Sequence, residues 1–306
     1  MADDGLNIAL RFGLYVCLAS AFGVALFGAY ALRGQEQTSL IARRLRVFVG
    51  GAMLGGITLS IASLAVLAKT MSGTPSYGDL SIHVFEMLLT GTHVGMAWSV
   101  RILALGVGLL LLVLPLRPQR CFQALAAACG LALATLAWVG HGAMDTGLRS
   151  AVHLGADIAH LWAAGAWVGA LCAFVMLASL PPNRLPDSLQ LLSRTSHGFA
   201  QWGSWIVATL TMTGAINYLL IVGSSLAPLS STGYGQLLLV KLALFMAMLA
   251  LAAANRYRLS PRLKQSLSTG RSDHARRLLR NSLWTETVLA LLVLWSVAWL
   301  GVLSPQ

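Results

Sequence analysis

The sequence predicts an all-α polytopic membrane protein: a bundle of eight transmembrane helices with a short interfacial helix near residues 80–90. Three observations lead to this fold class. Hydrophobic residues make up 57% of the 306 residues and charged residues only 10%, which is too little polar surface for a water-soluble domain. Eight apolar runs are each long enough to cross a bilayer. The basic residues fall mainly in alternate loops.

The eight runs hold most of the chain and are expected to be helical. A helix rises about 1.5 Å per residue, so each run can cross a hydrocarbon core of about 30 Å, where lipid offers the backbone no hydrogen-bond partners. The loops between them are too short for a soluble catalytic domain. We therefore expect a single transmembrane domain over residues 1–306, without internal repeats and without enzymatic activity. The runs are residues 7–32, 47–68, 94–114, 121–140, 153–178, 202–222, 236–254 and 284–303.

The first run is expected to remain in the protein as its first helix. The residues before it carry Asp3 and Asp4 instead of Lys or Arg, and no small-residue cleavage site follows, so it differs from a secretory signal peptide. After the second run, Leu80 to Leu89 are apolar at helical spacing but too few to span a membrane. They are expected to form a helix that lies at the outer surface. The third to eighth runs follow, joined by loops of 6 to 29 residues.

The distribution of basic residues predicts the orientation. The loops at 33–46, 115–120, 179–201 and 255–283 contain 16 Lys or Arg residues, whereas the opposite loops and both tails contain two, Lys69 and Arg149. By the positive-inside rule the first set is cytoplasmic, so both termini are periplasmic. The net charge of +11 then reflects topology and contact with anionic membrane lipid, and no nucleic-acid partner is expected.

Histidine and methionine side chains occur in pairs on the predicted outer side. A thioether is a soft metal ligand and an imidazole a borderline one, a combination that suits Cu(I). In each pair the methionine could instead simply fill a gap in an apolar core. The pairs, three or four residues apart, are His83 with Met87, His93 with Met96, and His141 with Met144.

The fifth run carries His153, Asp157 and His160 at positions i, i+4 and i+7, which places them on one helix face that Trp167 continues. A carboxylate that faced lipid would cost a few kcal/mol, so this face is predicted to look into the bundle or a wet cavity. Asp157 could accept the second ring N–H of either histidine and so support a metal ligand. The alternative is a structural ion pair between Asp157 and Arg101, which the depths of the two residues allow.

Other polar side chains lie within the predicted spans. Lys241 and Asn217 are at outer-half depth and are candidates to support the metal ligands. Lys241 could line an outer vestibule, or its long side chain could instead reach for the membrane interface. Glu286 is close to the cytoplasmic end of its run and is expected to pair with a basic residue there. The four cysteines all fall in predicted helices without a C-x-x-C motif, so no disulfide framework is expected.

Several motifs stand in fixed order from residue 90 onward. They are Thr92-His93-Val94-Gly95-Met96-Ala97-Trp98-Ser99-Val100-Arg101, Gly140-His141-Gly142-Ala143, His153, Asp157-Ile158-Ala159-His160, Trp167-Val168-Gly169-Ala170-Leu171, and a segment over 232–263 with Thr232, Tyr234-Gly235, Lys241 and Asn255-Arg256-Tyr257-Arg258-Leu259-Ser260-Pro261. In composition and spacing this series resembles the copper resistance D (CopD) family of bacterial inner-membrane proteins. The first 80 residues resemble that family only in consisting of two helices.

The resemblance implies a protein of the bacterial inner membrane that handles copper. It implies movement of periplasmic copper, as Cu(I), across the membrane toward the cytoplasm, with a small periplasmic copper-binding C-type protein as supplier. It also implies that eight residues should be tested first: Arg101, His141, His153, Asp157, His160, Lys241, Asn255 and Arg256.

Two alternatives remain open. Helix-borne histidines can ligate haem iron, so the chain could be a haem-binding or cupric-reducing electron-transfer protein. His153 and His160 lie on one helix and cannot supply opposite axial ligands to one haem, so His93 or His141 would have to complete the pair. The chain could also be a delivery factor that hands copper to a cuproenzyme. Because it carries no Walker motif or soluble nucleotide domain, it is not expected to hydrolyse ATP.

Overall fold

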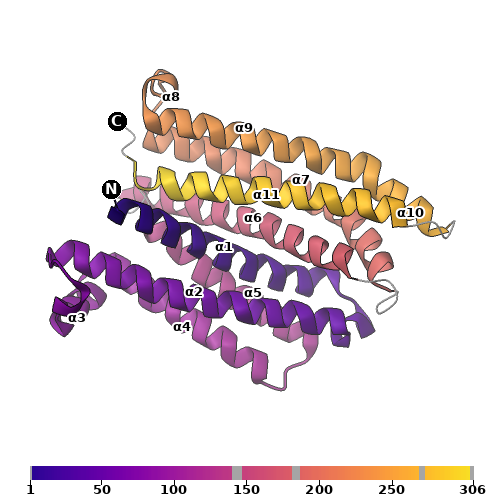
Figure 1. Ribbon diagram of the computed structural model, residues 1–306, viewed down its shortest axis with the longest axis horizontal. Helices are drawn as coiled ribbons and strands as arrows, with labels where there is room; N and C mark the ends of the chain where they lie inside the picture. The colour runs from indigo at the N-terminus through magenta and orange to yellow at the C-terminus, as the bar shows by residue number, and fades with distance from the viewer. Residues whose placement is uncertain (1, 140–146, 181–186, 269–272, 304–306) are drawn as a thin grey trace.

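A computed structural model describes residues 2–139, 147–180, 187–268 and 273–303, and no strand occurs in these residues. Eight helices within them are long and apolar enough to cross a membrane, in agreement with the eight apolar runs. The helices lie roughly along one common axis (Figure 1). They are Asp4–Ala31, Leu40–Ser72, His93–Val113, Pro118–Trp138, Gly147–Ser179, Gln201–Ile221, Gly233–Ser266 and Asp273–Leu300.

Several of these helices extend into, or are joined by, shorter elements. In chain order the elements are α1 (Ala2–Ala31), η1 (Gly34–Thr38), α2 (Leu40–Ser72), η2 (Tyr77–Asp79), α3 (Ile82–Gly91), α4 (His93–Val113), α5 (Pro118–Ala134), η3 (Thr135–Val139), α6 (Gly147–Ser179), α7 (Asp187–Ile221), α8 (Pro228–Ser231), α9 (Gly233–Ala254), η5 (Asn255–Leu259), α10 (Ser260–Ser268) and α11 (Asp273–Leu300).

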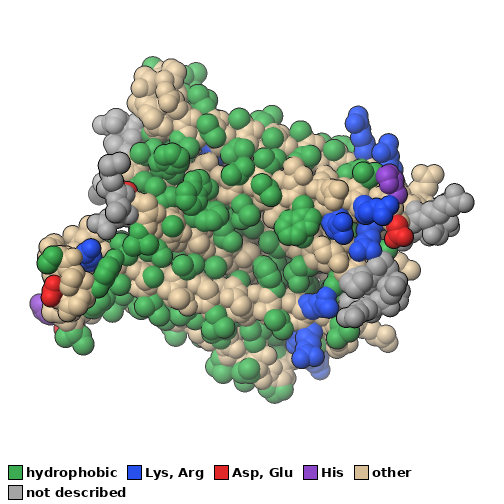
Figure 2. All heavy atoms as spheres, in the orientation of Figure 1, with side chains coloured by type: hydrophobic (Ala, Val, Ile, Leu, Met, Phe, Trp, Pro, Cys, Tyr) green, Lys and Arg blue, Asp and Glu red, His purple; other side chains and the backbone are tan. Residues whose placement is uncertain are grey.

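The two ends of the bundle differ in charge. Both termini lie at the end that also carries α3 and α8, whereas α10 lies at the opposite end (Figure 1). Figure 2 shows Lys and Arg side chains gathered at the α10 end, while the surface between the two ends is mostly hydrophobic. An apolar belt between a basic end and a nearly neutral end is the distribution that a bilayer selects.

Helix α1 occupies the centre and packs against α2, α5, α6 and α11. Its closest neighbour is α6, which it meets at Gly23 and Gly169. A Cβ atom added to Gly23 would come within 2.7 Å of the Gly169 Cα atom, so glycine is required for the two backbones to approach this closely. Small residues at such crossings are how membrane helices gain packing energy without help from water.

One structural unit occurs twice, although no repeat is evident in the residues themselves. A short helix leads into a threonine that caps a spanning helix: α3 leads to Thr92 and α4, and α8 leads to Thr232 and α9. Each threonine hydroxyl accepts from the backbone N–H three residues later, at 2.9 Å for Gly95 and 3.0 Å for Gly235. Each hydroxyl also donates, at 2.8 Å, to the carbonyl four residues earlier in the short helix.

The two units match in further detail. A Cβ atom at either capping glycine would collide with the short helix, at the Leu88 carbonyl oxygen in one unit and the Pro228 carbonyl oxygen in the other. Nine residues after each threonine stands a cation, Arg101 in α4 and Lys241 in α9. The chain therefore builds the same helix entry, with a basic side chain at the same depth, in each half.

Two predicted loops are partly helical. Helix α7 starts at Asp187, within the predicted loop 179–201, because Leu189 and Leu192 bury their side chains against the bundle. The predicted loop 255–283 begins as a π turn, η5, in which the Ser260 N–H bonds to the Asn255 carbonyl. Pro261 clashes with ordinary α-helical backbone, and the wider π turn lets the helix continue into α10.

The predicted helix near residues 80–90 is present as α3. It is amphipathic: Leu88 is buried, whereas Ile82 and Met87 are exposed. It packs against α4 and α2 at the end of the bundle that carries the termini (Figure 1). Its position at a membrane interface remains a prediction.

Candidate functional site

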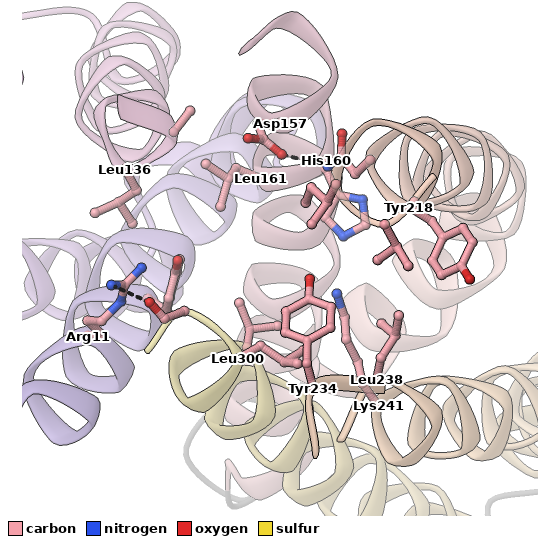
Figure 3. A pocket seen from close by; sticks show the side chains of 18 residues that line it. Arg11, Leu136, Asp157, His160, Leu161, Tyr218, Tyr234, Leu238, Lys241 and Leu300 are labelled. Carbon is pink, nitrogen blue, oxygen red and sulfur yellow. Dashed lines mark hydrogen bonds between the residues drawn. The ribbon is translucent and has the colours of Figure 1, made fainter. Parts of the chain in front are cut away.

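A cavity of about 190 Å³ lies between α1, α6, α7, α9 and α11 (Figure 3). Its lining includes the last residues of α7 and α11 and the first turn of α9, which places it toward the end where both termini lie. The volume is enough for several water molecules or a partly hydrated ion. Its polar lining residues are Arg11, Tyr15, Asp157, His160, Asn217, Tyr218, Tyr234 and Lys241.

Helix α6 supplies two of the polar groups on the stripe identified in the sequence. Asp157 and His160 both line the cavity, as the i, i+3 spacing requires of residues on one helix face. His153, one turn earlier, is 1% exposed and is not among the lining residues. Its Nε2 atom lies 3.9 Å from Asp157 Oδ2, so it stands behind the carboxylate.

The proton position on His160 follows from its neighbours. His160 Nδ1 is 2.8 Å from the Thr213 hydroxyl, and that hydroxyl lies 2.6 Å from the Thr209 carbonyl oxygen. A hydroxyl has one proton, and because Thr213 donates it to Thr209, it must accept from His160. Nδ1 therefore carries the ring proton, which leaves a lone pair on Nε2. The His160 ring faces the cavity beside Lys241 and Tyr234 (Figure 3).

The Asp157 carboxylate is held from α7. Asn217 Nδ2 donates to Asp157 Oδ1 at 2.6 Å, a short bond to a charged acceptor. The other amide atom, Asn217 Oδ1, is buried and has no hydrogen-bond partner in the described structure. An unpartnered carbonyl oxygen beside a carboxylate is a place where a water molecule or a cation gains a ligand.

Two cations also line the cavity. Lys241 reaches in from α9 and acts electrostatically on both Asp157 and His160. Arg11 of α1 donates at 3.1 Å to the carbonyl of Gly301, just beyond the end of α11, where the helix dipole favours positive charge. The cavity thus combines one carboxylate with two cations, and Asp157 is the only acidic side chain among its described lining residues.

Trp167 and Glu286 form a separate buried contact two turns below His160. The Trp167 indole N–H donates to Glu286 Oε1 at 2.9 Å, and Asn255 Nδ2 donates to Glu286 Oε2 at 2.8 Å. Glu286 therefore bonds to two neutral donors, and the basic partner expected from the sequence is not what the structure shows. Trp167 does not line the cavity, although it continues the face of Asp157 and His160.

Arg101 lies elsewhere in the bundle. It is 3% exposed, and its Nε atom donates to the Thr135 hydroxyl at 2.8 Å, where α5 passes into η3. The ion pair with Asp157 that the sequence left open is therefore not formed. Arg101 instead links α4 to α5.

The outer His and Met pairs are spread over the surface. His83 pairs with Glu86 at 3.8 Å, and both side chains are more than 70% exposed. Met87 and Met96 are also exposed, as is His93, and none of the four residues lines the cavity. His141 and Met144 lie outside the described residues; in the sequence they follow the lining residues Leu136 and Ala137. In the described chain no group of three or more His, Cys, Asp or Glu side chains is close enough to hold a metal ion.

Sequence reasoning missed Thr213 and Tyr234. Thr209, Thr213 and Asn217 recur every four residues in α7, and this polar stripe could have identified the face of α7 that contacts α6. Tyr234 lies seven residues before Lys241, on the same face of α9. This spacing can be seen in the sequence, but nothing in the sequence of one helix indicates which other helix the side chain of Tyr234 faces.

Comparison with protein-family models gives two matches along the chain. Residues 1–152 match the N-terminal domain of copper resistance protein D-like proteins, and residues 193–300 match copper resistance protein D. The first of these covers the 80 residues whose motifs showed no particular resemblance. No solved structure gave a significant match.

Three curated proteins are similar over most of the chain. Copper resistance protein D of Pseudomonas syringae pv. tomato is 44% identical over 99% of this chain and 98% of its own length. Inner membrane protein YebZ of Escherichia coli (strain K12) is 32% identical over 84% of this chain and 86% of its own length. Copper transport protein CutJ of Bacillus subtilis (strain 168) is 31% identical over 82% of this chain and 47% of its own length.

Proposed function

The chain belongs to the copper resistance protein D family, and we propose that it moves copper across a bacterial inner membrane from the periplasm toward the cytoplasm. The family is one of copper-handling proteins, and the eight apolar helices agree with a multi-pass membrane protein. The cargo of this chain, the direction, the ligands and the route through the bundle are our proposal. One relative is named as a copper resistance protein and another as a copper transport protein, which supports it.

The observation that carries the proposal is the Nε2 lone pair of His160 in the cavity. The Thr213 hydroxyl accepts a hydrogen bond from Nδ1–H, which leaves Nε2 as the ligand atom. Imidazole is a good copper ligand, and fixing its second nitrogen by a hydrogen bond raises its basicity. Asp157 supplies a negative charge to the same cavity, which stabilises a cation in a region that would otherwise exclude it.

We infer that Cu(I) is the cargo and that it enters stepwise. The exposed pairs His83 with Met87 and His93 with Met96 offer soft ligands at the end of the bundle that carries the termini. Cu(I) is stable with two or three ligands, so it can exchange between such pairs and His160 without forming a crowded site. The lack of a larger cluster of ligands in the described residues suits a cargo that must also leave.

The basic end of the bundle supports the inward direction. By the positive-inside rule, the end with α10 faces the cytoplasm and the end with the cavity faces the periplasm (Figure 2). The membrane potential, negative inside, then favours entry of a monovalent cation. We expect a small periplasmic copper-binding C-type protein to deliver copper at the end with α3 and α8.

The experiment is Cu(I) entry into sealed vesicles that contain the purified protein and a trapped Cu(I) chelator. Wild type should show entry above empty vesicles, and His160→Ala should abolish it, because the cavity then loses its nitrogen ligand. His197→Ala is the matched control, because this exposed histidine of α7 does not line the cavity. No entry by the wild type above empty vesicles, or full entry by His160→Ala, would overturn the proposal.

The same measurement separates the alternatives. A delivery factor would bind copper at His160 without vesicle entry. A haem protein would show a haem absorption band after purification. Among the described residues, His160 has no histidine facing it from another helix across the cavity, so this geometry does not favour a haem with two axial histidines.

A further inference from the structure

Glu286 is a buried acidic group that the copper route above does not use. It lies on α11 and is 3% exposed, within a candidate membrane span. Its two oxygens accept from Trp167 of α6 and from Asn255, the first residue of the π turn η5. One carboxyl group thus joins three elements at the inner end of the packed core.

In the described residues no Lys, Arg or His nitrogen lies within 4 Å of the Glu286 carboxylate. On the elements that pack against α11, the charged and titratable groups have other positions. Asp157, His160, Lys241 and Arg11 line the cavity, His153 lies behind Asp157, and Arg149 donates to the Leu220 carbonyl at 2.7 Å. Asp4 of α1 is exposed, as are Arg256, Arg258, Arg262 and Lys264 of η5 and α10, and Arg256 is bonded to Ser204 at 3.1 Å.

A buried carboxylate without a cation is costly in a membrane, and a proton removes that cost. Glu286 is not among the lining residues of the cavity described above. Carboxylate and amide oxygens are also poor ligands for a soft ion such as Cu(I). A proton is the one cation that fits a packed carboxyl group with two neutral hydrogen-bond donors.

We propose that Glu286 is a proton-binding site whose occupancy is linked to the passage of copper between α6, α9 and α11. The inference rests on the proposed copper transport. Trp167 lies seven residues beyond His160 on α6, which is about 10 Å along the helix. A Cu(I) ion that moves from the cavity toward the basic end approaches the carboxyl group and carries one positive charge.

One carboxylate balances one positive charge, so the proton and the copper ion compete for it. As Cu(I) approaches, the O–H bond of Glu286 breaks, the proton leaves toward the periplasmic side, and the carboxylate stabilises the ion. When Cu(I) has left toward the cytoplasm, the carboxylate takes up a proton from the cytoplasmic side. Each copper ion that enters is therefore exchanged for one proton that leaves, with no oxidation or reduction.

The π turn η5 carries Asn255, whose orientation depends on whether Glu286 is protonated. Asn255 Nδ2 donates to the carboxylate, whereas Asn255 Oδ1 is buried and has no hydrogen-bond partner in the described structure. A protonated Glu286 can donate to this oxygen if the amide turns over, so the two protonation states select different orientations of Asn255. π turns occur often at functional sites, where a side chain must be re-aimed.

The test records proton release and copper entry together in sealed vesicles with a pH-sensitive dye. Wild type should move about one proton outward for each Cu(I) that enters, and Glu286→Gln should transport copper without this proton movement. Glu36→Gln is the matched control, because the partly exposed carboxylate of Glu36 pairs with Arg194 at 2.7 Å and does not line the cavity, and it should behave as wild type. Proton release by Glu286→Gln equal to that of wild type would overturn the inference while leaving copper transport intact.

A second measurement does not depend on transport. Infrared difference spectra over a pH titration should show a protonated carboxyl band in the wild-type protein. Trp167→Phe removes the indole donor and should shift this band, and Glu286→Asp should shift it while keeping one titrating group. The absence of any band that responds to these substitutions would overturn the inference even if Glu286→Gln fails to fold. If wild type moves no copper, the proposed function fails, and the infrared band still decides whether Glu286 binds a proton.

Discussion

His160 Nδ1 lies 2.8 Å from the hydroxyl of Thr213, and this contact between α6 and α7 determines which ring nitrogen faces the cavity. The hydroxyl is in turn bonded to the Thr209 carbonyl, so it can only accept from the ring. The residue that binds copper in our proposal is therefore oriented by a threonine on the neighbouring helix.

Thr213→Val should weaken Cu(I) binding roughly 10- to 100-fold, the range seen when a group behind a metal ligand is lost. Valine keeps the shape but cannot accept the Nδ1 proton, so the His160 ring loses its fixed orientation. Competition against a chromophoric chelator measures the affinity. Thr58→Val on α2 is the control, since its hydroxyl bonds only to its own helix at an exposed position. Unchanged affinity in Thr213→Val would show that the ring orientation does not depend on this bond.

Lys241→Met should strengthen Cu(I) binding by roughly tenfold or more, because an ammonium near the ion repels it in a medium of low dielectric constant. Entry into vesicles should slow, since the ion is held more tightly. Lys69→Met is the control: this cation lies 4.9 Å from the centre of the Tyr77 ring and away from the cavity. Weaker binding in Lys241→Met would mean that the lysine organises Asp157 instead of opposing the metal.

Gly169→Ala should lower the stability of the bundle by roughly 1–3 kcal/mol, because the added methyl group meets the backbone of α1 at Gly23 and forces the helices apart. Thermal unfolding in detergent measures the effect. Gly155→Ala on the same helix has nothing within 4 Å of the new methyl group and should be neutral or slightly stabilising. Equal stability of the two variants would contradict the close crossing.

The accessibility of introduced cysteines tests which end of the bundle faces the cytoplasm. Ser76→Cys lies near α3, and Lys264→Cys lies on α10. In a background without the native cysteines, a membrane-impermeant maleimide should label Ser76→Cys in spheroplasts and Lys264→Cys only after disruption, if the basic end is cytoplasmic. The reverse pattern would invert the proposed direction of copper movement.

Hydropathy alone predicted the spanning helices, since lipid leaves the backbone no alternative to a helix. The loops were less predictable. The helical start at Asp187 and the π turn before Pro261 depend on burial by other helices, which a single run does not reveal. Of the predicted His153, Asp157, His160 stripe, Asp157 and His160 line the cavity and His153 does not. The stripe could not show that Thr213 of α7 would bond to His160, or that Arg101 would bond to Thr135 instead of Asp157. Spacing along one helix fixes a face, whereas partners depend on how separate helices are placed.

The repeated entry of α4 and α9 has different surroundings in the two halves of the chain. In the first unit, Trp98 of α4 donates to the Ser60 carbonyl of α2 at 2.8 Å, and the two helices are joined. In the second unit, a cavity with Lys241 opens between α9 and α7. The same entry therefore stands in two settings, a closed contact between helices in the first unit and the wall of a cavity in the second. We expect a larger side chain to be accommodated more readily at a lining position of the second unit than at the contact of α4 with α2.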